Sequence, residues 1–115
     1  TSDMGHHDFC FMIYPHSGDY ASAEINNLSF EYNVPLAKAD VKSNLPDFGK
    51  LWLQAVKLSE NGKQIVIRLS EQNGERGVVK LPESVSVLNM LEDEIGKTDT
   101  VEYSPFEIIT PGINI

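Results

Sequence analysis

The stretch 51–74 most constrains the fold, because two apolar runs in it are separated by the dipeptide Asn61-Gly62. Asn and Gly both tolerate the positive φ angles that a two-residue type I′ turn requires, and this dipeptide between apolar runs is a strong β-hairpin signal. A four-residue loop over 60–63 gives the same strand pairing as the two-residue turn. The sequence therefore predicts two antiparallel strands joined at this point.

The register of the hairpin divides its side chains between two faces. Counting back from the turn pairs Val56 with Ile67, and the same count places Trp52 opposite Glu71. A three-residue loop would set apolar residues opposite polar ones. The face expected to meet the core carries Trp52, Val56, Leu58, Ile65, Ile67 and Leu69. The opposite face carries Leu53, Ala55, Lys57, Val66, Arg68 and Ser70.

Composition bounds the class of protein. The chain has 115 residues, 41% of them hydrophobic, and a net charge of −8, which predicts one globular domain, or one domain with part of another. An acidic surface repels phosphate backbones and anionic lipid, so nucleic-acid and membrane binding are not expected. The single cysteine, Cys10, excludes an internal disulfide, is expected to be buried or half-buried, and suits a reducing, cytoplasmic location.

The chain before the hairpin predicts one strand and one helix. Residues 6–14 alternate in character and predict a strand that is apolar on much of both faces. Residues 19–32 predict a helix with Asp19 as its N-cap, ending before Val34-Pro35. One face of this helix is expected to hold Ala21, Ile25, Leu28 and Tyr32. Because the chain begins at Thr1, close to a strand-like pattern, we expect it to be a piece of a longer protein.

The chain after the hairpin predicts several short strands. Residues 78–81 form one candidate that Pro82 stops, and 84–91 form the next. Gly96 is expected to turn the chain, and residues 101–103 and 106–110 supply the last strand or pair of strands. Short strands at this spacing predict an all-β fold, a small antiparallel β-sandwich with one short helix near the N-terminus.

Four groups of residues could form a site, and the sequence favours a structural role for each of them. His6, His7 and His16 with Asp8 lack the spacing of a structural zinc site. The acidic run 92–94 is typical of a solvated charge cluster rather than a catalytic carboxylate pair. An exposed Trp52 could stack on a sugar, but its predicted face favours burial. Arg68 and Glu71 are expected to make structural hydrogen bonds. We therefore assign no catalytic, cofactor-binding or metal-binding residue.

The order of several small motifs carries a family resemblance. The motifs are Asp3-x-Gly5-x-His7-x-Phe9-x-Phe11, Pro15-His16-x-Gly18, Asn33-x-Pro35-Leu36, Ala55-Val56-Lys57, Asn61-Gly62, Arg68-Leu69-x-Glu71, Asn89-x-Leu91-Glu92 and Pro105-Phe106-Glu107-Ile108-x-Thr110. In this order they resemble the C-terminal part of the α-mannosidases of glycoside hydrolase family 38, and we expect a bacterial parent. Ser70 stands where that family commonly has an aromatic residue, and Asn61 where it commonly has Asp.

The resemblance implies a division of the chain and a role for it. Residues 1–18 would be the last strand of a preceding central β-sandwich domain, 19–50 a helix and connector, and 51–115 the C-terminal β-sandwich domain. The parent enzyme would hydrolyse α-mannosidic bonds in mannose-containing glycans with retention, using an Asp nucleophile and zinc in an N-terminal catalytic domain. This piece alone would be non-catalytic, would pack against the rest of the mannosidase chain, and could contribute to a homo-oligomer.

Two other functions stay open at this point. A carbohydrate-binding β-sandwich module without catalytic activity would use exposed aromatic side chains to contact glycan. An interaction domain of an unrelated protein would need neither a mannosidase parent nor a sugar.

Overall fold

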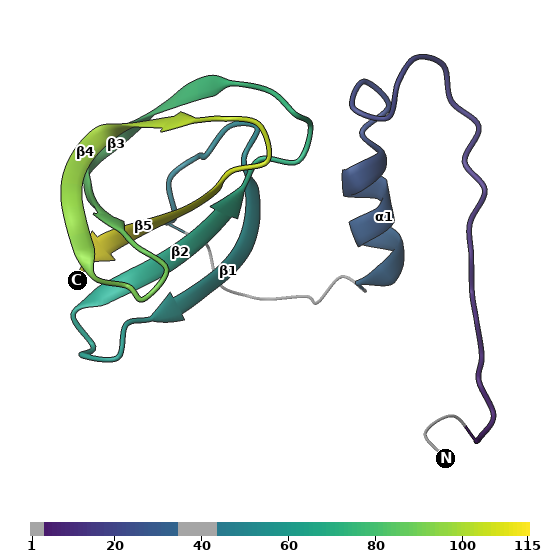
Figure 1. Ribbon diagram of the computed structural model, residues 1–115, viewed down its shortest axis with the longest axis horizontal. Helices are drawn as coiled ribbons and strands as arrows, with labels where there is room; N and C mark the ends of the chain where they lie inside the picture. The colour runs from purple at the N-terminus through teal and green to yellow at the C-terminus, as the bar shows by residue number, and fades with distance from the viewer. Residues whose placement is uncertain (1–3, 35–43) are drawn as a thin grey trace. The chain divides into compact units, whose positions relative to one another are not determined.

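The computed structural model describes residues 4–34 and 44–115. The chain divides into two compact units, Thr1–Leu36 and Ala37–Ile115, which Figure 1 shows as a helical part and a sheet part. The motif residues Asp3, Pro35 and Leu36 lie outside the described residues. The assignment of residues 1–18 to a preceding domain stays a prediction.

The N-terminal segment of the first unit is extended but forms no strand. Residues 6–16 have no strand partner among the described residues (Figure 1). The strand expected over 6–14, with neighbours in a preceding domain, therefore stays a prediction. The alternation of side chains persists, because the rings of His7 and Phe9 stack with centroids 6.2 Å apart. Phe11 is 83% exposed, and Cys10 is exposed rather than buried. Because this extended segment has no neighbouring strand among the described residues, most of its apolar side chains stay exposed.

The helix of the first unit, α1, spans Ile25–Asn33 and is shorter than the predicted 19–32. Asp19 accepts a hydrogen bond at Oδ1 from the backbone N–H of Ser22 (2.8 Å), as an N-cap does, but this caps only a turn. Glu24 then adopts a left-handed conformation with φ 52°, which separates the turn from the helix. Ala21 therefore lies outside the helix whose face it was expected to share.

The second unit is a single antiparallel sheet. Its strands are β1 (Trp52–Leu58), β2 (Gln64–Ser70), β3 (Gly77–Leu88), β4 (Glu94–Tyr103) and β5 (Ile108–Asn114). They lie in the order β1-β2-β5-β3-β4, and Figure 1 shows the sheet curving so that β3 and β4 arch over β2 and β5. Strands with one short helix near the N-terminus confirm the predicted all-β sandwich class.

The predicted hairpin is confirmed, with a four-residue loop. Val56 pairs with Ile67 and Leu58 with Ile65. Only Gly62 of the two central residues has a positive φ, 71°, so the turn is not type I′. The side chain of Asn61 instead accepts the backbone N–H of Lys63 at Oδ1 (3.0 Å). The sequence did not decide between a two-residue turn and a four-residue loop, and both give the same strand register.

A bulge in β1 changes the register at its far end. Leu53, rather than Gln54, pairs with Leu69, and Trp52 pairs with Ser70 rather than Glu71. One residue is inserted into β1 here, so the side chains beyond it change faces. Trp52 is half-buried on the face opposite to Leu69. Its predicted place on the core face is therefore wrong.

The later strands are longer than the sequence indicated. β3 continues through Pro82, which lies in an irregular stretch between Lys80 and Val85 where β4 offers no regular partner. Proline has no backbone N–H to donate, but no hydrogen bond between strands is lost where the neighbouring strand is not regularly paired. Gly96 pairs with Val87 inside β4 instead of turning the chain. β5 likewise continues beyond its predicted end at residue 110.

The core lies between β2 on one side and β3 with β4 on the other. The buried apolar cluster comprises Phe48, Leu51, Ile67, Leu69, Leu81, Val85, Val101 and Tyr103. Phe48 comes from the segment that was expected to be only a connector, and Leu51 directly precedes β1. β1 itself contributes none of them, since every residue from Leu53 to Leu58 is exposed.

Candidate functional site

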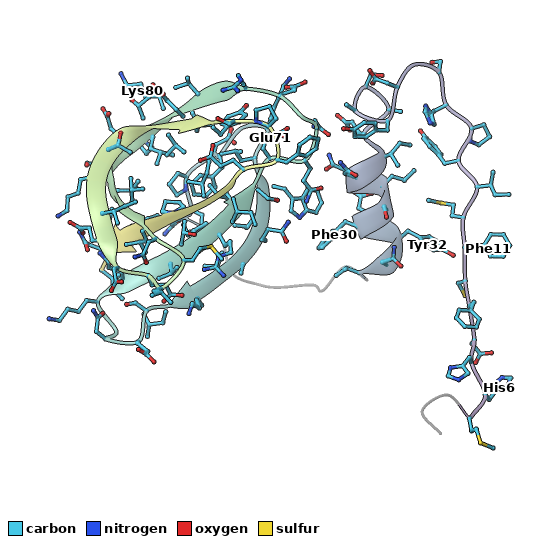
Figure 2. The ribbon with its side chains drawn as sticks, viewed as in Figure 1. His6, Phe11, Phe30, Tyr32, Glu71 and Lys80 are labelled. Carbon is cyan, nitrogen blue, oxygen red and sulfur yellow. The ribbon has the colours of Figure 1, made fainter. Side chains whose placement is uncertain are left out.

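The histidines do not form a metal site. His6 Nε2 lies 3.1 Å from Asp8 Oδ1, with both side chains 88% exposed, and Figure 2 shows His6 on the extended N-terminal segment. Within residues 4–34 and 44–115, no group of three or more His, Cys, Asp or Glu residues could hold a metal ion. The zinc that the resemblance implies was expected in a separate catalytic domain of the parent enzyme, and that expectation stays a prediction.

The acidic residues 92–94 engage different neighbours. Glu92 Oε1 lies 2.6 Å from Lys57 Nζ on β1. Glu94 accepts a hydrogen bond from the hydroxyl of Ser86 at 2.5 Å, and Ser86 is only 1% exposed. Asp93 accepts from a side-chain amide in the same turn at 3.1 Å. These carboxylates hold the β3–β4 turn and the sheet together, so they are more than a solvated charge cluster.

Among the described residues of the sheet unit, Glu71 is the carboxylate with the most hydrogen bonds from backbone N–H groups. It is 5% exposed and follows the last residue of β2, close to the sheet interior in Figure 2. Its Oε1 accepts the backbone N–H of Asn73 at 2.6 Å. Its Oε2 accepts those of Gly74 and Phe106, each at 2.8 Å. One side chain thus joins the loop after β2 to the turn before β5.

The surroundings of Glu71 keep it ionised. Burial alone would raise the pKa of this carboxyl, but the backbone N–H groups of Phe106, Asn73, Glu75 and Gly74 bring its pKa below the ordinary value of 4.5. Donors aimed at a carboxylate favour its charged form. Its own N–H also donates to the carbonyl of Glu107 at 2.9 Å. The predicted structural role of Glu71 is confirmed by these bonds.

Arg68, expected to make structural hydrogen bonds, makes none at Nε. This nitrogen is buried and has no hydrogen-bond partner among the described residues. Arg68 and Glu71 therefore do not act as a pair. No motif in the sequence distinguishes the bonded side chain from the unbonded one, since both were expected to be hydrogen-bonded.

A groove of about 510 Å³ is lined by residues of β3, β4 and β5 and of the turn before β5. Most of its lining is apolar: Val85, Val87, Leu88, Ile95, Val101, Ile108, Ile109 and Pro111. Two carboxylates, Glu102 and Glu107, also line it. Glu107 Oε2 is already hydrogen-bonded to the backbone N–H of Ser104 at 2.7 Å. The groove thus shows no free pair of catalytic carboxylates.

The aromatic side chains of the sheet unit offer no stacking platform. Phe48 and Tyr103 are buried, and Trp52 is half-buried. Phe106 is 66% exposed, but the edge of its ring lies over Gly74.

No helix in the described residues is long and apolar enough to cross a membrane.

Comparison with known proteins identifies relatives. Residues 50–110 match the model of the glycosyl hydrolases family 38 C-terminal beta sandwich domain. The chain is 28% identical to Alpha-mannosidase G of Dictyostelium discoideum over an alignment of 136 residues, which covers 96% of this chain and 12% of that protein. It is 28% identical to Alpha-mannosidase 2C1 of Mus musculus over 88 residues, covering 64% of this chain and 8% of that protein. No solved structure matches.

The matched region coincides with the sheet unit. Residues 50–110 include β1 to β4 and the beginning of β5, and they make up more than half of the 115 residues. This match excludes an interaction domain of an unrelated protein. The chain spans about a tenth of the length of the two mannosidases it resembles. It belongs to the family of C-terminal β-sandwich domains of the family 38 glycosyl hydrolases.

Proposed function

We propose that this chain is the non-catalytic C-terminal structural domain of an α-mannosidase and that it packs against the rest of that enzyme. Family membership and two relatives named as α-mannosidases support the proposal. The parent would hydrolyse α-mannosidic bonds of glycans with retention, with its Asp nucleophile and zinc in a separate catalytic domain. A cytoplasmic location, a bacterial parent and possible homo-oligomers belong to the same proposal.

The carboxylates of the sheet unit support a non-catalytic role. A retaining glycosidase needs two carboxyl groups about 5 Å apart on either side of the scissile bond. The buried carboxylate of Glu71 is occupied by three backbone N–H groups. Glu92 and Glu94 bind different side chains of the sheet. A sugar would therefore have to displace structural bonds to reach either group.

The exposed apolar side of β1 is the observation that carries the packing role. Leu53 and Val56 are each 44% exposed and Leu58 is 57% exposed, although two of them lie beside core residues of β2. β1 is also an edge strand of the sheet, so its outer backbone groups lack a strand partner within residues 4–34 and 44–115. An apolar edge strand is a surface that proteins normally cover, and the remainder of the parent chain is the proposed cover.

Activity measurements on two proteins test this role. The pure 115-residue chain should not hydrolyse an aryl α-mannoside, whereas the whole parent enzyme should. In the whole enzyme, Val56→Asp should weaken the packing of this domain and make it more sensitive to added protease, whereas Glu83→Gln, a change at an exposed residue of β3, should not. Clear turnover by the pure chain would contradict the non-catalytic assignment.

A glycan-binding screen separates this role from that of a carbohydrate-binding module. The structural domain should show no glycan binding. Micromolar binding that is lost in Phe106→Ala, the exposed aromatic residue of the sheet unit, would favour the module instead.

A further inference from the structure

Arg68 lies on the outer face of the sheet, in the middle of β2. Its neighbours Ile67 and Leu69 are both completely buried in the core, and side chains alternate along a strand. Arg68 therefore points away from the core. Its partner across the hairpin is Ala55 on β1, whose small, exposed side chain leaves the approach to the guanidinium open on that side.

The polar groups on both sides of Arg68 already have partners. Towards the end of β2, the hydroxyl of Ser70 accepts hydrogen bonds from the side-chain amides of Gln54 at 2.8 Å and Gln72 at 3.3 Å. Towards the hairpin turn, Lys57 forms its ion pair with Glu92 at 2.6 Å. The side chains next to Arg68 on this face of β2 are largely shielded from water, because Val66 is 2% exposed and Ser70 is 7% exposed.

Arg68 is the exception on this face. Its Nε is buried without a hydrogen-bond partner, and no ion pair to it occurs among the described residues. A buried donor without an acceptor is unfavourable, and more so for a charged group. The chain contains 17 Asp and Glu residues against 9 Lys and Arg residues. Acidic groups are therefore abundant, yet none of the described ones reaches this guanidinium.

We infer that Arg68 anchors this domain to the rest of the mannosidase chain by binding an Asp or Glu side chain from that remainder. A guanidinium presents a planar fork of donors that matches a carboxylate, and such pairs suit buried interfaces. Leu53 and Val56 pair with core residues of β2, so they lie on the face opposite to Arg68. Arg68 therefore adds a charged contact on the other face of the same edge hairpin, where the exposed Ala55 leaves its guanidinium open. The inference rests on the proposed function.

Comparing one substitution in two proteins tests the inference. Arg68→Met removes the charge and keeps an apolar stem of similar length. In the 115-residue chain alone, its thermal unfolding midpoint should stay the same or rise, because an unsatisfied buried donor disappears. In the whole parent enzyme, the midpoint of this domain should fall by several degrees, because the partner carboxylate would lose its counter-charge. Arg68→Lys should give a smaller fall, since it retains the charge but not the fork.

Lys57→Gln is the matched control. Lys57 is a cation on the same face of the sheet, but its partner, Glu92, belongs to this chain. Its substitution should therefore change the midpoint by the same small amount in both proteins. An equal fall for Arg68→Met in both proteins would show that Arg68 acts within the domain, and no fall in the whole enzyme would show that it binds no carboxylate there. Either result overturns the inference.

The α-mannosidase activity of the unsubstituted parent is measured separately. An inactive parent would refute the proposed function, while the comparison of unfolding midpoints would still decide whether Arg68 binds another part of that chain.

Discussion

At the scale of single residues, Glu71 joins two loops that are distant in the sequence. Its carboxylate accepts the N–H of Phe106, 35 residues further along the chain, and Phe106 has a positive φ of 59°. A non-glycine residue in that conformation is strained. The hydrogen bond to Glu71 stabilises the turn in which this strain occurs, so Glu71 sets the path of the chain into β5.

Glu71→Gln should destabilise the domain. The amide presents one acceptor oxygen and places an N–H donor where a backbone N–H points, so at least one buried hydrogen bond is lost. The expected loss is about 1–3 kcal/mol in the free energy of unfolding, measured by urea denaturation at pH 7. Glu75→Gln is the control, because its exposed ion pair with Lys50 should contribute little. Equal effects of the two substitutions would contradict the role assigned to Glu71.

The lowered pKa of Glu71 predicts an acid-sensitive domain. Because this pKa lies below the ordinary value of 4.5 in the folded chain, the unfolded state binds the proton more tightly. The contribution of Glu71 to stability is therefore fully present well above pH 4.5 and is lost as the pH falls below it. Unfolding curves between pH 7 and pH 3 should show the difference between the original chain and Glu71→Gln becoming smaller. A difference that grows on acidification would contradict this sign.

At the scale of elements, two strand glycines differ in what a side chain would meet. A Cβ on Gly77 of β3 would overlap the ring of Tyr103 on β4, whereas nothing lies within 4 Å of a Cβ on Gly96. Gly77→Ala should therefore destabilise by about 1–3 kcal/mol. Gly96→Ala should be neutral or slightly stabilising, since alanine loses less conformational freedom on folding. Thermal unfolding of both variants measures the contrast, and equal midpoints would show that Tyr103 can move aside.

The paired strands β1 and β2 also differ in their energetic roles. Val56 and Ile67 lie opposite each other, yet Ile67 is completely buried and Val56 is 44% exposed. Ile67→Ala should cost about 2–5 kcal/mol because it leaves a cavity. Val56→Ala should cost less than about 1 kcal/mol in the isolated chain, since half of its surface is already in water. Urea denaturation of the two variants gives both values, and similar losses would place β1 in the core.

Local patterns predicted the strands near the hairpin turn well and failed where distant contacts decide. The pairing of Val56 with Ile67 follows from the turn and from alternation. The bulge near Gln54 and the passage of β3 through Pro82 depend on neighbouring strands, which periodicity does not reveal. The role of Glu71 could be expected only in outline, because its partner at Phe106 is remote in sequence. The lack of a partner for Arg68 leaves no trace in the sequence at all.

At the scale of the whole molecule, the two units differ in how completely they bury their apolar residues. All the residues of the core cluster lie between Phe48 and Tyr103, within the sheet unit. α1 has no buried residue, and in the extended segment Phe9 and Ile13 are 85% and 82% exposed. The sheet unit therefore contains a hydrophobic core that can stabilise it alone, whereas the described part of the first unit exposes most of its apolar side chains.

Removing residues 1–36 should leave the stability of the sheet unit unchanged and reduce self-association. No core residue is lost, so the unfolding midpoint in urea should stay that of the complete chain. The exposed Phe9, Phe11 and Ile13 would be gone, and an unpaired apolar segment favours association between chains. Sedimentation of both chains over a range of concentrations measures this. A triple substitution of these three residues by Ser in the complete chain should reproduce the loss of association, and undiminished association would place the contact on the sheet, with β1 the first strand to test.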